Sequence, residues 1–203
     1  MSIVKLNNRG VRSATAFGSI TGLGSMVFIK KQTASSSSTI SFVDGTSDVV
    51  LDNTYKEYLF TFNNIHPSGD NTDFQVNFRD GGSAYDATKT STVFESYHTE
   101  GDEAALGYKD SFDLAQSTAV QKITSNIGND NDQSASGYLH LFNPSDTTFV
   151  KHFIVKSVHY GGDYQEQYYA AGYCNVTAAI DAVQFSMSSG TIDAGDICLY
   201  GIN

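Results

Sequence analysis

Residues 73–79 read Asp-Phe-Gln-Val-Asn-Phe-Arg, and this stretch decides the fold class. Apolar and polar side chains alternate without interruption, so Phe74, Val76 and Phe78 share one face of an extended chain. A period of two residues is typical of a β-strand with one face in a hydrophobic core, whereas a helix would scatter these side chains around its axis. The stretch therefore predicts a strand that packs against a second layer.

The same period recurs along most of the chain. Residues 181–187 repeat it, and residues 149–160 extend it into a long strand that is partly apolar on both faces. A strand of that kind needs cover on both sides. Short turn-rich segments separate the runs, and the only sizeable helix candidate, residues 114–127, is rich in Ser and Thr, which favours loop or strand. We predict an all-β protein, an antiparallel β-sandwich of jelly-roll type. Further predicted strands are residues 26–31, 39–43, 55–62, 93–98, 138–142, 168–174 and 197–202.

The first 38 residues differ from the rest in charge. They hold five of the twelve basic residues and none of the 22 acidic ones, and they end in a run of serines. We therefore predict an extended basic arm over residues 1–38 and a β-sandwich domain over residues 39–203. A basic arm can bind an acidic surface, including the body of a neighbouring copy.

Composition excludes several classes of protein. A chain of 203 residues is one domain's worth of material, and a net charge of −10 excludes a broad phosphate-binding face and disfavours binding to anionic lipid. The apolar run at residues 14–29 is interrupted by glycine and hydroxyl residues, so we expect mature sequence there rather than a membrane span or a signal peptide. We expect neither nucleic acid nor membrane as a partner.

No catalytic or metal-binding motif is evident. The five histidines lack ligand spacing, and the acidic turns at residues 70–73 and 129–132 lack the glycine and the bidentate glutamate of a calcium loop. Cys174 and Cys198 are expected to be reduced thiols in strands, although a bridge would be possible if their strands were neighbours. We therefore expect no enzyme, no cofactor and no metal site.

A cluster of tyrosines near residue 170 remains as the candidate binding surface. An exposed tyrosine offers a rigid ring at low entropic cost, which suits a protein or a glycan partner. Half of such rings could instead fill the sandwich core. An intersubunit interface is favoured over glycan binding, with Tyr164, Tyr168, Tyr169 and Tyr173 as its candidates.

Both ends of the chain carry a resemblance. Residues 180–202 hold an aromatic strand, a Ser-Ser-Gly turn and a Leu-Tyr-Gly-Ile ending, which predict a hairpin with strands around Phe185 and Leu199. This ending is similar to that of small virion structural proteins of tailed bacteriophages, and residues 4–20 resemble the start of such proteins from marine phages, cyanophages in particular. The resemblance implies a homo-oligomer in a virion, most often a trimer, with major capsid or tail proteins as further partners.

Two functions follow as hypotheses. The first is a non-enzymatic structural subunit that decorates or cements the capsid or forms a short appendage, assembled through its aromatic patches and its arm. The alternative is a host-surface glycan-binding module of a tail fibre or spike. In the arm, the candidate interface residues are Lys5, Arg9, Arg12 and Phe17.

Overall fold

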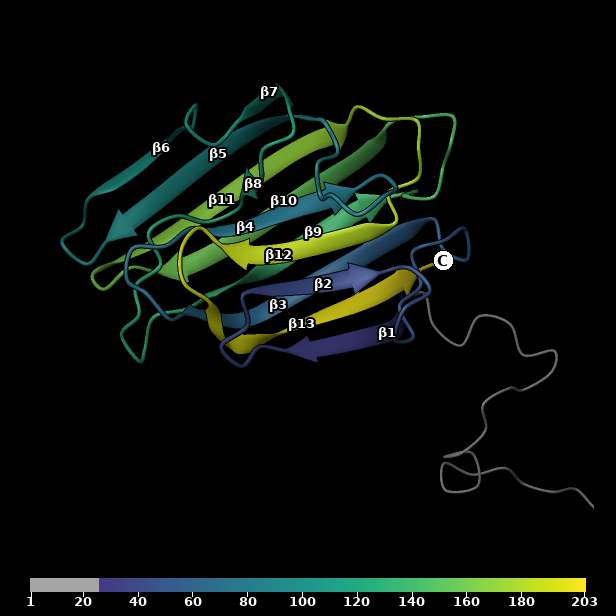
Figure 1. The fold of residues 1–203 in the computed structure, drawn as a ribbon. Coiled ribbons are helices and arrows are strands. Elements are labelled where there is room, and N and C mark those ends of the chain that lie inside the picture. Colours follow the sequence, from purple (N-terminus) through teal and green to yellow (C-terminus); the bar gives the residue numbers. More distant parts are fainter. Residues whose placement is uncertain (1–25) are drawn as a thin grey trace, which may run out of the picture.

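The computed structural model describes residues 26–203, which form two antiparallel β-sheets packed face to face (Figure 1). The larger sheet has nine strands and the smaller has four. The predicted antiparallel β-sandwich is therefore confirmed. No helix occurs within the described residues, so none of them belongs to a helix that could cross a membrane.

The larger sheet has the strand order β1-β13-β3-β9-β10-β11-β5-β6, and the short strand β7 pairs with β5 as well. The smaller sheet has the order β2-β12-β4-β8 and lies in front of the larger one in Figure 1. The strands are β1 (Met26–Thr33), β2 (Thr39–Val43), β3 (Glu57–Pro67), β4 (Phe74–Arg79), β5 (Lys89–Thr99), β6 (Ala104–Tyr108), β7 (Leu114–Ser117), β8 (Gln121–Lys122), β9 (Ala135–Phe142), β10 (Lys151–Tyr160), β11 (Tyr164–Cys174), β12 (Ala182–Met187) and β13 (Ile192–Ile202).

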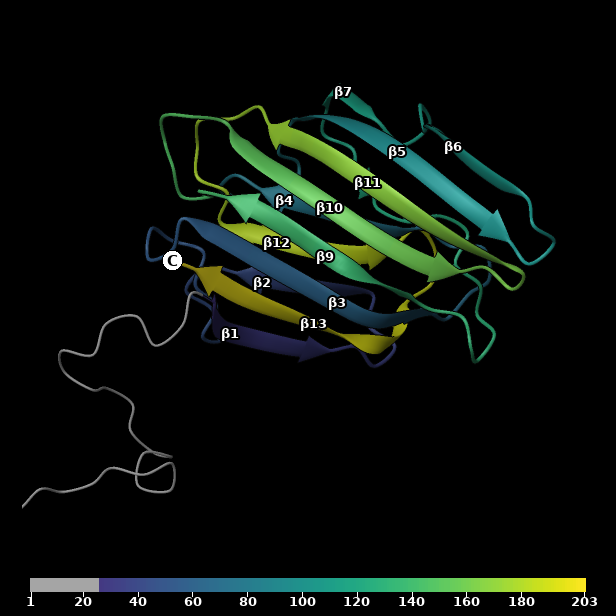
Figure 2. The same ribbon diagram turned by 180° about the vertical axis from the view of Figure 1, so that it is seen from behind.

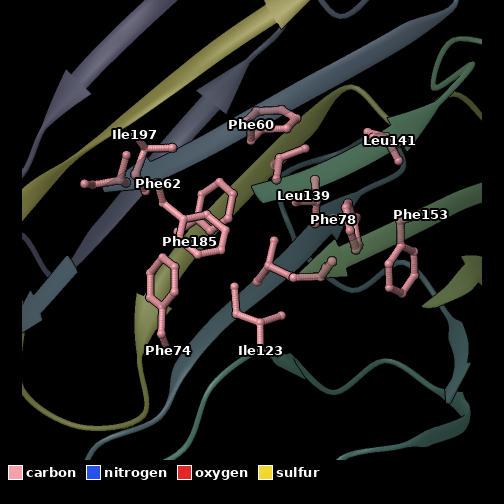
Figure 3. Packing of buried hydrophobic residues seen from close by; sticks show 14 of the residues in the cluster. Phe60, Phe62, Phe74, Phe78, Ile123, Leu139, Leu141, Phe153, Phe185 and Ile197 are labelled. Carbon is pink, nitrogen blue, oxygen red and sulfur yellow. The ribbon is translucent and has the colours of Figure 1, made fainter. Parts of the chain in front are cut away.

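The core between the sheets is built from the inward residues of the alternating strands. Phe185 of β12 lies at its centre, with its ring centroid 5.6 Å from that of Phe74 and 5.8 Å from that of Phe60 (Figure 3). Phe42 and Phe62 complete the group from the two sheets. All five rings are fully buried, and each such ring contributes on the order of 2 kcal/mol by leaving water.

The polar face of β4 is also covered. Gln75 and Asn77 are buried although the alternation places them away from the core, because loops lie over this side of the smaller sheet. The Asn77 side-chain amide donates to the carbonyl oxygens of Tyr85 and Thr118, which belong to two of these loops. Alternation thus identifies the core face correctly, while the opposite face is buried by chain segments without periodicity.

Every strand predicted from the alternation is found, but three short strands are missed. These are β6, β7 and β8: β6 is apolar at nearly every position and so does not alternate, and β7 and β8 have only four and two residues, too few to show a period. Residues 114–127 contain β7, β8 and irregular chain and no helix. Short edge strands of this kind are specified by the neighbours that they pair with.

The hairpin predicted near the C-terminus is wrong. Phe185 lies in β12 of the smaller sheet, between β2 and β4, whereas Leu199 lies in β13 of the larger sheet, between β1 and β3. The Ser-Ser-Gly turn therefore carries the chain from one sheet to the other. β12 pairs with β2 and β4, and β13 pairs with β1 and β3, so the two strands lie on opposite sides of the core instead of side by side.

The predicted arm boundary at residue 38 is also wrong. Residues 26–33 form β1, which pairs along its length with β13 at the edge of the larger sheet, and the Ser37 amide donates to the carbonyl oxygen of Ile192. The sandwich therefore includes residues 26–38. The remaining arm predictions, Lys5, Arg9, Arg12 and Phe17, lie outside the described residues.

The two cysteines are free, as expected. Cys174 lies in β11 and Cys198 in β13, and three strands separate these two in the larger sheet. Burial raises the pKa of the Cys174 thiol to about 12, so this thiol is protonated and unreactive at neutral pH.

Candidate interaction surface

The nine-stranded sheet has one face without cover from the described residues. The smaller sheet covers only its inner side, and the view from behind shows β3, β9, β10, β11 and β5 with nothing described in front of them (Figure 2). We call this solvent-facing side of the larger sheet the outer face. Because strands alternate, every second residue of each strand projects from it.

Strand β10 shows why this face is unusual. Its inward residues Phe153 and Val155 are buried in the core, and its outward residues Ile154 and Val158 are exposed aliphatic side chains. The expectation that this strand is apolar on both faces is therefore confirmed. The core covers its inward face, as expected. The other side has no cover from residues 26–203.

The register of the strands aligns aromatic side chains in one line across the outer face. We call this line the aromatic row; successive members are cross-strand partners, from β9 to β6. Its four rings are 38–48% exposed, high values for aromatic side chains in the middle of strands. The row consists of Tyr138, Lys156, Tyr169, Phe94 and Tyr108.

Contacts within the aromatic row hold its side chains in place. The Lys156 ammonium lies 5.1 Å from the centroid of the Tyr169 ring, and the Phe94 and Tyr108 rings meet edge to face at 5.5 Å. A hydrogen bond to Tyr169 raises the pKa of Lys156, so this amine stays charged at neutral pH. The row is thus a pre-ordered strip of rings with one cation, which suits a binding surface.

A second apolar group lies on the outer face at the opposite edge of the sheet. Phe28 of β1 packs edge to face on Tyr200 of β13 at 5.7 Å. Next to it, Leu59 and Ile202 line a hollow of about 520 Å³ that reaches Tyr138 of the aromatic row. Apolar side chains therefore lie at both edges of the outer face, with polar side chains such as Thr61 and Asn63 between them.

Two carboxylates on this face have a basic partner. The Lys31 ammonium lies 2.8 Å from Asp196, and the His140 ring lies 2.9 Å from Glu57. Such partly exposed pairs contribute little to stability. Lys156 of the aromatic row has no ion-pair partner among the described residues, so it is the cation that this face presents to a partner.

The structure divides the predicted tyrosines into different environments. Tyr169 and Tyr173 lie on the outer face, whereas Tyr164 lies at one end of the sheet. The prediction of Tyr168 as an interface residue is wrong. Its ring is fully buried, stacks on Phe112 at 5.3 Å and shares a 2.7 Å hydrogen bond with Ser125, because alternation turns it inward when Tyr169 points outward.

Sequence reasoning missed most of the aromatic row. Phe94, Tyr108 and Tyr138 are separated by many residues and become neighbours only through strand pairing. The available signal was the alternation in residues 93–98 and 138–142, which gives each strand two faces but does not say which one is covered. The sequence therefore predicts that these aromatic residues lie in strands, but not that they form one exposed surface.

The described residues contain no group of three or more His, Cys, Asp and Glu side chains that could hold a metal ion. In the acidic turn at residues 70–73, Asp73 is engaged by Lys122 at 2.7 Å and by the amide of Asn126. Asp70 bonds to its neighbour Asn71. These carboxylates are therefore committed to local structure.

Comparison with known proteins finds no family model that matches the chain, no matching curated protein and no matching solved structure. Function therefore has to be inferred from the surface chemistry of the chain itself.

Proposed function

We propose that the protein is a non-enzymatic structural subunit of a tailed-phage particle, joined to its neighbours through the outer face. The observation that carries the proposal is the aromatic row, a line of four exposed rings and one lysine that runs from β9 to the edge strand β6. Contiguous exposed apolar surface of this kind marks a site of protein association. The resemblance of both chain ends to phage virion proteins supplies the biological setting, on the capsid or on the tail.

The occupant of the outer face is residues 1–25 of a neighbouring copy. Charge favours this occupant: residues 1–25 carry three basic residues and no acid, which leaves nine basic and 22 acidic residues in residues 26–203. The segment also supplies apolar side chains such as Val11, Phe17 and Ile20. Opposite net charges attract the segment to the body, and apolar contacts with the rings stabilise the complex.

The position and the length of the segment also fit. Residue 26 begins β1 at the edge of the larger sheet, with Met26 and Phe28 exposed. A chain of 25 residues reaches at most about 80 Å, whereas the eight strands that lie side by side across the sheet span about 34 Å at their usual spacing. The segment is thus long enough to leave its own sheet and to cross the outer face of the next copy. A closed ring, such as the trimer that the resemblance implies, would cover every face once.

Analytical ultracentrifugation at micromolar concentration tests this function. The full chain is expected to sediment as an oligomer, and both a chain lacking residues 2–25 and the Phe94→Glu variant as monomers of about 20 kDa. Phe149→Glu is the matched control, because Phe149 is 69% exposed but lies in the loop before β10 and not in the aromatic row. A monomeric full chain, or an oligomer that survives both changes, would overturn the proposal.

A further inference from the structure

Two loops lie side by side at one end of the sandwich, as both ribbon views show (Figures 1 and 2). One connects β10 to β11 and the other connects β5 to β6. The Glu100 amide of the second loop donates to the carbonyl oxygen of Asp163 in the first, at 2.8 Å. This bond ties the loops together, so the surface between them has a defined shape.

Two adjoining hollows open at this end, with volumes of about 350 and 250 Å³. Tyr164 and Thr99 line both, so the Tyr164 ring stands between them. Tyr160 adds a second ring in the first hollow, and Tyr97 adds a third in the second. We call the pair of hollows the Tyr164 site. It is separate from the aromatic row, none of whose residues lines either hollow.

The Tyr164 ring is held rigidly. It lies against the backbone of Gly161, where a side-chain Cβ would overlap the tyrosine Cζ atom, and it meets the His159 ring edge to face at 6.0 Å. The next residue, Gly162, has a φ of +97°, which other residues rarely adopt. The Gly-Gly sequence thus allows a tight turn that packs an aromatic ring on the main chain and leaves one side of it facing the hollows.

The Tyr164 site is rich in acceptors, and it also holds donors, since His98, Thr99 and Gln165 line the first hollow and His98 lies 3.3 Å from Asp102. Glu100 and Asp102 line the first hollow, and Glu166 and Asn126 line the second. None of the residues lining the two hollows is Lys or Arg. Burial and then the negative charges of Glu100, Asp132 and Asp163 raise the pKa of Tyr160, which reflects the same negative field. An anionic ligand would be repelled here, whereas a neutral ligand with many hydroxyl groups finds acceptors.

Glu166 contributes a carboxylate to the second hollow. Its side chain is nine-tenths buried, yet the residue reaches the second hollow. On its inner side the carboxyl group interacts with the side chains of Tyr168 and Glu95, and the buried His159 lies 3.6 Å away. Because a carboxylate can accept several hydrogen bonds, the part of Glu166 that lines the hollow can accept one from a ligand hydroxyl group.

We propose that the Tyr164 site binds a neutral oligosaccharide, with one sugar unit in each hollow. Tyrosine rings stack on the apolar face of a sugar ring, and carboxylate and amide oxygens accept hydrogen bonds from its hydroxyl groups. The acidic lining selects uncharged sugars over sialylated or sulfated ones. Binding needs no metal ion, since the described residues offer no cluster of metal ligands there. This function is independent of assembly through the outer face.

A glycan array printed with neutral glucose-, galactose- and mannose-based oligosaccharides and with sialylated and sulfated ones tests the proposal on the full chain. Neutral glycans are expected to bind, with EDTA present, and charged ones are not. The best neutral oligosaccharide is then titrated calorimetrically. Tyr164→Ala is expected to weaken binding at least tenfold, and Glu100→Gln, which keeps the side-chain shape, about fivefold or more.

Tyr138→Ala is the matched control, because it removes an exposed tyrosine from the outer face and leaves the Tyr164 site intact. It is expected to keep full glycan affinity, while Tyr164→Ala keeps the sedimentation behaviour of the full chain. Circular dichroism of each variant shows whether it is folded. If Tyr164→Ala does not fold, the glycan affinity of Glu100→Gln alone tests the proposal. Absence of binding to neutral glycans, preference for anionic glycans, or full affinity in Glu100→Gln would overturn the proposal.

Discussion

Two lysines buried in the sandwich show how single residues depart from a simple hydrophobic pattern. Lys89 and Lys151 are fully buried and are both cross-strand partners of Cys174. The Lys89 ammonium donates to Asn77 Oδ1 at 2.6 Å and to the Ala87 carbonyl oxygen at 2.7 Å, and that of Lys151 to the Val176 carbonyl oxygen at 2.9 Å. Burial lowers the pKa of Lys89 to about 8. Each amine satisfies loop carbonyl groups that would otherwise be buried unpaired.

His159 gives a prediction at the same scale. Burial lowers its pKa to about 4, well below the 6.5 of an unfolded chain. Between pH 6.5 and about pH 4, His159 is therefore protonated in the unfolded chain but stays neutral in the folded chain. The stability that neutral His159 contributes is complete above pH 6.5 and is lost as pH falls toward 4, by an amount on the order of 3 kcal/mol.

His159→Leu removes this dependence, so urea unfolding of the variant is expected to change less than that of the wild type between pH 7 and pH 4. Burial raises the pKa of the neighbouring Glu166, which makes stability fall as pH rises above its unfolded value near 4.5. Because Glu166 lies 3.6 Å from His159, the double variant His159→Leu/Glu166→Gln is compared with Glu166→Gln alone to isolate the contribution of His159. Parallel pH profiles for wild type and variant would show that His159 is not the buried neutral group described here.

At the scale of elements, β1 separates the roles of the N-terminal residues. It protects the edge of β13, whose backbone groups would otherwise be free to pair with another chain. Of the arm that composition indicates over residues 1–38, residues 26–38 belong to the sandwich. The acid-free composition thus extends to residue 38, whereas the sandwich already begins with β1 at Met26.

Two truncations test this division. A chain lacking residues 2–25 is expected to keep the melting temperature of the full chain at a concentration where both are monomeric, since every residue of the core remains. A chain lacking residues 2–38 loses β1 and exposes β13, and it is expected to melt at least 5 °C lower and to aggregate. Equal melting temperatures for the two truncated chains would mean that β1 contributes nothing to the sandwich.

At the scale of the whole molecule, the negative charge and the exposed aromatic side chains lie in different regions and have different roles in assembly. The acidic excess is spread over residues 26–203, while the aromatic row on the outer face consists of four rings and one lysine. Long-range attraction would bring the basic segment of one copy to the body of another, and the aromatic row would then hold it.

Salt should therefore weaken assembly. The screening length falls from about 14 Å at 50 mM to about 4 Å at 500 mM sodium chloride, so attraction between segment and body is largely lost. The dissociation constant of the oligomer, measured by sedimentation, is expected to be at least tenfold higher at 500 mM than at 50 mM sodium chloride. Assembly that strengthens with salt would instead indicate that the outer faces of two copies associate through apolar contacts, without residues 1–25.

The local part of this fold is legible in the sequence, because alternation is a property of a few consecutive residues. It predicted the strand at residues 73–79 and the two partly apolar sides of β10. The Tyr168–Tyr169 pair shows its limit: alternation says that one ring points inward and the other outward, but only the packed core shows which.

Tertiary structure decided everything that depends on neighbours distant in the chain. The separation of β12 from β13, the aromatic row and the Tyr164 site each join segments that no local period relates. Strand pairing is chosen by the summed fit of whole faces, with a cost of loop closure that grows only slowly with the intervening length. A sequence therefore determines which residues can form strands and share a side, and the packing of all the strands together determines which sides become core and which become surface.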